Sequence, residues 1–266
     1  MRFQFLNILA ITLISVSCTV TGTLYDDQLP ELPDDTPKLT LTFHQSGSIS
    51  IGIVGSGSVV IDWGDGETSE THTVSNNNTN FQRSYSGTGS RTLTIAGKNI
   101  TRLNCSDSQV TQLEVSEITT LVYLFCSDNE LEKLDLSKNA ALTDLYCGNN
   151  KLTDLKISEN KALKNMDCSN NELTELPDLS NNPHLITLLC NDNKLANLSI
   201  SDCAALRFLN CDSNHLGAPA LSVLLLSLHG NALAGGKIIS IKNNPGTDAC
   251  LNKDIAKSNG WEVIDI

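Results

Sequence analysis

The residues best suited to chemistry in this chain are its cysteines, nine among 266 residues. Thiolates bind metals, form disulfides and attack electrophiles. Six of the cysteines recur at intervals of 21, 21, 21, 22 and 21 residues: Cys105, Cys126, Cys147, Cys168, Cys190 and Cys211. A metal site needs ligands that converge on one point, usually as Cys-x-x-Cys pairs, whereas this period spreads the thiols along a line. We therefore expect no metal at these cysteines.

Disulfide formation and core packing are the two remaining roles for the periodic thiols. If each period adds one parallel strand, neighbouring cysteines lie about 4.8 Å apart with parallel Cα–Cβ bonds. That spacing exceeds the usual Cβ separation of a disulfide, about 3.5 to 4.5 Å. We therefore favour small, polarisable core residues that are poor nucleophiles when buried. Cys203 and Cys250 lie outside the period and have no assigned role.

Other arrangements typical of catalysis are missing from the sequence. The five histidines show no His-Glu-x-x-His spacing, and there is no Gly-x-Ser-x-Gly elbow, Walker A loop or dinucleotide-binding Gly-x-Gly-x-x-Gly. The formal net charge is −12, which opposes binding to a phosphate backbone. We expect no enzymatic activity, no catalytic residue, no cofactor and no nucleic-acid partner.

The elements that hold the cysteines follow from the residues around each one. Aliphatic residues or methionine recur two and five positions before the cysteine, and another aliphatic residue follows five positions after it. Three positions after it stand Ser108, Asn129, Asn150, Asn171, Asn193 and Asn214. The unit L-x-x-L-x-C-x-x-N-x-L resembles the leucine-rich-repeat signature with cysteine in a leucine position, and a similar pattern is nested in the rest of each period. Over about residues 100–216 it closely resembles the cysteine-ladder repeats of the internalins, a family of bacterial surface proteins.

This pattern predicts a leucine-rich-repeat solenoid, mostly β, with short parallel strands. Residues 98–216 would form six coils of about 21 residues, each burying its leucines and cysteine against the next. The asparagines Asn129, Asn150, Asn171, Asn193 and Asn214 would bond backbone groups of adjacent coils. The segment Leu176–Leu179 inserts one residue and lengthens its coil on the side away from the cysteine strand.

The residues before the repeats predict a β-sandwich-like module over residues 38–97. Apolar residues alternate with polar ones, as in Leu39-x-Leu41-x-Phe43, which indicates strands. The run Asp62-Trp63-Gly64-Asp65-Gly66 resembles the hallmark of PKD-type β-sandwiches. Its spacing does not fit a calcium-binding loop, so we assign Asp62 and Asp65 to turn formation. The module is expected to cap the first coil.

Residues 217–266 are expected to form an α/β cap over the last coil. The pattern predicts a helix over 218–228, a strand over 237–241, a helix over 248–258 and a strand over 261–266. Trp261 is expected to pack over the final coil.

The N-terminal segment indicates export. Residues 1–17 hold one cation and an apolar stretch too short for a permanent membrane span, which is typical of a signal peptide. The sequence Ser15-Val16-Ser17-Cys18 resembles the lipobox of bacterial lipoproteins, which implies a lipid on Cys18; a secretory signal with a chance cysteine is the alternative. Residues 18–37, acidic and rich in proline, would form a tether. Because Thr19 follows Cys18 where an aspartate would mark inner-membrane retention, we expect a lipid-anchored protein of the outer membrane. The resemblance to bacterial surface proteins implies that it is exposed at the cell surface.

A candidate binding surface lies on the strands that carry the cysteines. Residues three and one positions before each cysteine would point outward, on the concave face of the solenoid. They include four aromatic residues and two carboxylates: Tyr123, Phe125, Tyr146, Phe208, Asp144 and Asp167. Exposed aromatic residues favour protein or glycan binding. A stack that only stiffens the sheet is the alternative.

Together these features predict a non-catalytic, lipid-anchored surface protein that binds a protein or glycan through its concave face. The internalin resemblance implies an adhesin. A structural or assembly role at the outer membrane and capture of polysaccharide are the alternatives.

Overall fold

The computed structural model describes residues 32–44, 47–232 and 236–266, which all belong to one compact unit, Leu32–Ile266. The expected signal peptide, Cys18 and most of the expected tether lie outside the described residues. Within the described residues, no helix is long and apolar enough to cross a membrane.

Two sheets form the β module. Its strands are β1 (Lys38–His44), β2 (Gly47–Gly55), β3 (Gly57–Asp62), β4 (Glu70–Val74), β5 (Thr79–Tyr85) and β6 (Ser90–Ala96). In one sheet β1 pairs with β6, and β6 with β3; in the other, β2 pairs with β5. The alternating apolar residues of β1 and β2 are buried, as a period of two predicts.

Asp62 and Asp65, whose spacing does not fit a calcium-binding loop, stabilise turns of the β module. Asp62 Oδ1 accepts a hydrogen bond from Gly64 N at 2.9 Å, and Asp65 Oδ1 accepts one from Glu67 N at 3.1 Å. Gly64 has φ +67°, and a Cβ there would lie 2.2 Å from Thr92 O, so only glycine fits this turn.

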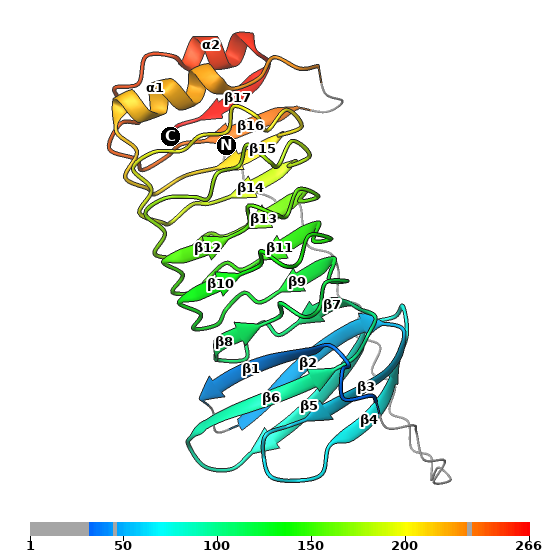
Figure 1. The fold of residues 1–266 in the computed structure, drawn as a ribbon. Coiled ribbons are helices and arrows are strands. Elements are labelled where there is room, and N and C mark those ends of the chain that lie inside the picture. The colour runs from blue at the N-terminus through cyan, green and yellow to red at the C-terminus, as the bar shows by residue number, and fades with distance from the viewer. Residues whose placement is uncertain (1–31, 45–46, 233–235) are drawn as a thin grey trace. The chain divides into compact units, whose positions relative to one another are not determined.

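The repeats form a solenoid in which each cysteine-bearing segment adds one short parallel strand (Figure 1). These strands are β7 (Ile100–Asn104), β9 (Tyr123–Phe125), β11 (Asp144–Tyr146), β13 (Asn165–Asp167), β14 (Thr187–Leu189) and β15 (Phe208–Asn210). Equivalent residues pair in register, as in Leu124↔Leu145. This arrangement confirms the predicted mostly-β leucine-rich-repeat solenoid.

The β module continues directly into the solenoid through both of its sheets. Strand β2 pairs antiparallel with β7, and β1 pairs antiparallel with β8 (Val110–Glu114). The sheet of β2 and β5 is therefore part of a ten-stranded sheet with the order β17-β16-β15-β14-β13-β11-β9-β7-β2-β5. On the other side of the coils, β10 (Lys133–Asp135) and β12 (Asp154–Lys156) form a parallel pair.

The repeats continue past Leu216, where the sequence pattern predicts their end. Helix α1 (Ala218–Ser227) is followed by β16 (Lys237–Ser240), which pairs in parallel with β15. Ile241 then takes the place of a cysteine, and Asn244 takes the place of a ladder asparagine: its Nδ2 donates to Cys211 O at 2.9 Å. Because α1 and its loop separate Cys211 from Ile241 by 30 residues instead of 21, the 21-residue period does not reveal this coil.

The last elements close the solenoid. Helix α2 (Lys253–Ser258) begins five residues later than the pattern predicts. Turns precede it, in which Thr247 Oγ1 donates to Ile241 O at 2.6 Å and Ala249 N donates to Gly246 O at 3.2 Å. Strand β17 (Trp261–Ile264) pairs with β16 and extends the sheet once more. Trp261 is buried, and its Nε1 donates to His229 O at 3.0 Å.

Candidate functional site

The cysteines occupy the interior of the solenoid. All eight in the described residues are buried free thiols: Cys105, Cys126, Cys147, Cys168, Cys190, Cys203, Cys211 and Cys250. Burial raises the pKa of the Cys105 thiol to about 12 and that of Cys126 well above its ordinary value. Cys211 Sγ also donates to Ser240 O on the next strand, at 3.3 Å. The thiols are thus placed to fill the core and to meet the neighbouring backbone.

The asparagines bind successive coils to one another. At Asn150, Nδ2 donates to Cys126 O of the preceding coil at 2.9 Å and to Cys147 O of its own coil at 3.1 Å, while Oδ1 accepts from Leu131 N at 3.0 Å. Equivalent bonds to the preceding cysteine carbonyl are made by Asn129, Asn171, Asn193 and Asn214. Each side chain therefore pairs backbone groups that two coils would otherwise leave unpaired.

Two rows of side chains lie on the outer surface of the ten-stranded sheet, which we call the strand face. One row is Arg102, Tyr123, Asp144, Asn165, Thr187 and Phe208; the other is Asn104, Phe125, Tyr146, Asp167, Leu189 and Asn210. All twelve are half-buried, while the residues between them point into the core. The strands thus display these side chains in register.

Three of the predicted aromatic residues form one cluster with Arg102. The rings of Phe125 and Tyr146 are stacked, with centroids 4.8 Å apart and planes inclined by 4°. The Arg102 guanidinium lies 4.7 Å from the centroid of the Tyr123 ring and 5.4 Å from that of Phe125. We call these four residues the aromatic cluster. Such stacking and cation–π contacts fix the side chains before a ligand binds, so these side chains lose little conformational entropy on binding.

The two predicted carboxylates border this cluster. Asp144 accepts hydrogen bonds from Asn165 Nδ2 at 2.7 Å and Thr143 Oγ1 at 2.6 Å. Asp167 Oδ1 accepts from Ser169 N at 3.0 Å. Burial raises the pKa of Tyr146 to about 12, and the negative charges of Asp144 and Asp167 contribute in the same direction. The phenol therefore remains neutral at physiological pH.

Phe208 does not join the aromatic cluster. It lies on β15, separated from the β11 strand of Tyr146 by β13 and β14. All four predicted aromatic residues lie on strands of the same sheet, and a role of Phe208 in ligand binding stays a prediction. Arg102 also belongs to the cluster but is not among the binding residues predicted from the sequence, although its place in the row beside Tyr123 could have identified it.

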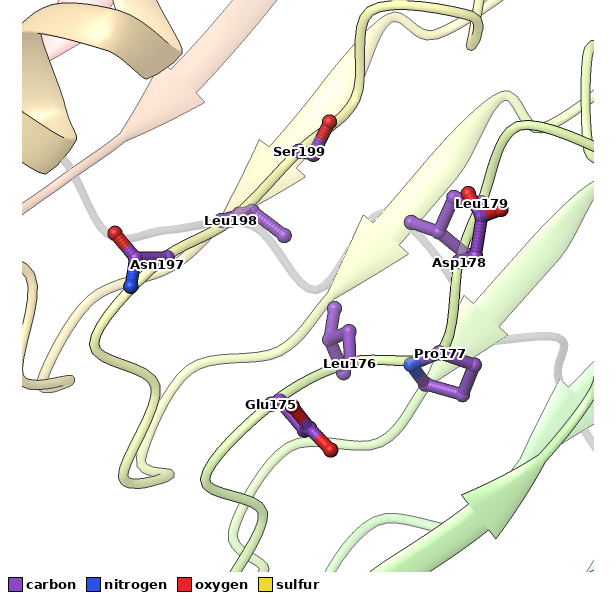
Figure 2. Close-up of a pocket in the computed structure, with 8 residues that line it drawn as sticks. All are labelled: Glu175, Leu176, Pro177, Asp178, Leu179, Asn197, Leu198 and Ser199. Atoms are coloured by element: carbon purple, nitrogen blue, oxygen red, sulfur yellow. The ribbon is translucent and has the colours of Figure 1, made fainter.

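An open hollow lies on the side of the coils that carries β10 and β12. Its volume is about 320 Å³, and it is lined by Glu175, Leu176, Pro177, Asp178, Leu179, Asn197, Leu198 and Ser199. Leu176 and Leu198 lie along the gap between two chain segments, while the polar ends of Glu175 and Asn197 point away from it (Figure 2). The inserted residue near Pro177 leaves these segments without strand pairing, so the hollow is a packing consequence of the longer coil.

Among residues 32–44, 47–232 and 236–266, no three His, Cys, Asp or Glu side chains are placed to hold a metal ion.

No protein-family model and no curated protein matches this chain. It is similar to the solved functional domain of InlJ from Listeria monocytogenes, which includes a cysteine ladder, with 33% identity, 58% of this chain and 32% of that chain covered, and a TM-score of 0.49. For the internalin inlF of the same species the values are 22% identity, 62% and 46% coverage, and a TM-score of 0.46. For the Toll–Spatzle complex of Drosophila the identity is 15%, with 63% of this chain and 29% of that chain covered and a TM-score of 0.47. The chain thus spans about a third of the InlJ domain.

Proposed function

We propose that this chain is a non-catalytic, adhesin-like surface protein that binds a protein ligand through the aromatic cluster on its strand face. The observation that carries the proposal is the in-register display of Tyr123, Phe125 and Tyr146 on the neighbouring strands β9 and β11. These rings are half-buried, so they are held in place by the sheet and still reach solvent. Rigid aromatic residues of this kind supply much of the energy in protein interfaces.

The stacking geometry favours a protein over a glycan. A sugar ring that packs on an aromatic side chain needs an open ring face. One face of Phe125 is covered by Tyr146 from β11, and the other is approached by Arg102 from β7, because β9 lies between those strands. Phe125 therefore offers mainly its edge, which suits the irregular surface of a protein.

Site-specific photocrosslinking on intact cells tests this proposal. A photoreactive phenylalanine analogue would replace Tyr123 on the strand face, Lys156 on the exposed side of β12 or Val223 on α1, where the side chain is 65% exposed. We expect a discrete crosslinked protein from position 123 and none from position 156. Crosslinking from position 223 alone would instead favour the structural or assembly role, in which the cap holds a partner.

A second measurement uses binding of the purified crosslinked partner. The double variant Tyr123→Ala/Tyr146→Ala should weaken binding at least about tenfold, because each truncated aromatic anchor costs more than about 1 kcal/mol. Phe208→Ala is the matched control, since it removes a ring from the same face outside the aromatic cluster. Unchanged binding by the double variant would contradict the proposed site.

We also propose that a lipid on Cys18 anchors the protein in the outer membrane with the repeats outside the cell. The lipobox-like sequence before Cys18 supports the lipid, and Thr19 after it supports the outer membrane. The variant Cys18→Ala should release the protein from the membrane fraction, and protease added to intact cells should remove the wild-type repeats. Membrane association that survives Cys18→Ala would exclude the lipid as the anchor.

A further inference from the structure

The aromatic cluster contains a cation whose hydrogen-bonding groups are unused within the described residues. The guanidinium of Arg102 carries five N–H donors in a planar fork. It is held by the rings of Tyr123 and Phe125, its Nε is buried, and none of its donors meets an acceptor in the described part of the chain. By contrast, Arg83 in the β module donates to both Asp65 and Glu70. Arg102 is thus oriented by its neighbours and unpaired.

The opposite edge of the cluster carries unpaired negative charge. Among the residues that the structure describes, the carboxylates of Asp144 and Asp167 accept hydrogen bonds only from the neutral groups of Asn165, Thr143 and Ser169. Neither forms an ion pair with a basic side chain of the described residues. These donors hold the two carboxylates in place and leave their charge available to a ligand.

Strand order fixes the distance between these charges. Arg102 lies on β7, Asp144 on β11 and Asp167 on β13, with β9 between β7 and β11. Neighbouring strands are about 4.8 Å apart, so the positive and negative ends are separated by about 10 to 14 Å along the sheet. The aromatic rings occupy the space between them.

We infer that the strand face binds a polypeptide segment that places a carboxylate on Arg102 and a cation on Asp144 and Asp167, with an apolar side chain on the rings between them. In an extended segment, residues i and i+4 lie on one face about 13 Å apart, which matches this spacing. A planar guanidinium favours carboxylates, which it can bind through two parallel hydrogen bonds. The inference rests on the proposed function and specifies the partner's chemistry.

General electrostatics does not account for a carboxylate preference here. The net charge of −12 repels acidic ligands and attracts basic ones over the whole molecule. A ligand that prefers glutamate to glutamine at one end must therefore meet a local cation. Preference for an acidic group is consequently the sharper part of the test.

The experiment measures binding of capped synthetic peptides to the isotope-labelled full chain by nuclear magnetic resonance. The probes are Glu-Thr-Val-Thr-Lys and its two analogues in which glutamine replaces either the glutamate or the lysine. We expect the parent peptide to bind about three- to tenfold more tightly than either analogue and to shift the side-chain Nε–H signal of Arg102. Equal affinity for the three peptides, or an unmoved Arg102 signal, would overturn the inference.

Variants assign each preference to its residue. Arg102→Gln should abolish the preference for glutamate and keep that for lysine, while Asp144→Asn/Asp167→Asn should do the reverse. Arg91→Gln is the matched control, because Arg91 also lies over a ring, that of Tyr85 at 4.9 Å, and its loss changes the net charge equally. A glutamate preference that survives Arg102→Gln, or a shift with glucuronate and none with the peptide, contradicts the inference.

Failure of this inference is distinguishable from failure of the proposed function. If the peptides bind without charge preference and the variant Tyr123→Ala/Tyr146→Ala no longer binds them, the charge assignment is contradicted while the aromatic site stays in place. Absence of crosslinking from position 123 would contradict the protein-binding site itself.

Discussion

Burial decides which reactions a ladder thiol can undergo. Since the pKa of Cys105 is raised to about 12, almost none of it is thiolate at pH 8, and the core excludes reagents as well. We predict that the eight cysteines of the described residues resist alkylation in the native chain at pH 8 and all react after denaturation without reductant. Mass spectrometry of the alkylated chain counts them. Fewer than eight reactive thiols after denaturation would indicate disulfides.

Asn150 shows how much one side chain contributes to the stacking of coils. Asn150→Ala leaves Cys126 O without its Asn150 donor and Leu131 N without its Asn150 acceptor. We expect the free energy of unfolding to fall by about 1 to 3 kcal/mol, the cost of unpaired buried polar groups. Urea denaturation measures this change. Asn197→Ala, at an exposed position of a later coil, is the control and should change stability by less than about 0.5 kcal/mol.

Within the β module, an ion-pair cluster joins β5 to the turn after β3 and to β4. Partial burial favours the neutral form of Asp65, but hydrogen bonds from Glu67 N and Arg83 outweigh it and lower its pKa. The pKa of Glu70 is also lowered, against partial burial, by hydrogen bonds and by the charges of His72 and Arg83. Because both folded-state pKa values are depressed, the stabilisation is present above the ordinary values of 3.8 and 4.5 and is lost as pH falls below them.

We therefore predict that stability of the β module falls as pH drops from about 5 to about 3. Trp63 fluorescence during urea denaturation reports the module when Trp261 is replaced by phenylalanine. The variant Arg83→Met should flatten this pH dependence, because the two carboxyl groups lose their cation. An equally steep dependence in Arg83→Met would show that other groups cause it.

The period of the sequence predicts most elements, because each coil repeats the same burial problem. The period fails as a predictor where a coil is interrupted. Helix α1 obscures the coil of Ile241 and Asn244 in the sequence, and the hollow beside the residue inserted near Pro177 is not evident from the spacing. Register also predicts which side chains share the strand face. It cannot show that Arg102 lies over Tyr123, because that contact depends on the conformations of both side chains.

Across the whole described unit, the ten-stranded sheet runs from the β module through the repeats to the cap. The sequence predicts a module that caps the first coil, and in the structure both sheets of the module pair directly with that coil. In a solenoid each coil is stabilised by its neighbours, so such continuity should make unfolding cooperative from one end to the other. The two tryptophans, Trp63 in the module and Trp261 in the cap, report these ends separately.

We predict that variants with a single tryptophan, obtained by replacing the other with phenylalanine, unfold at the same urea concentration whichever end is observed. Weakening the middle coils with Asn150→Ala should separate the two midpoints, because the stretches on either side then share a poorer interface. Asn197→Ala should leave the midpoints together. Two transitions already separated before any change in the middle coils would mean that the β module unfolds as an independent domain, despite the strand pairing that joins it to the repeats.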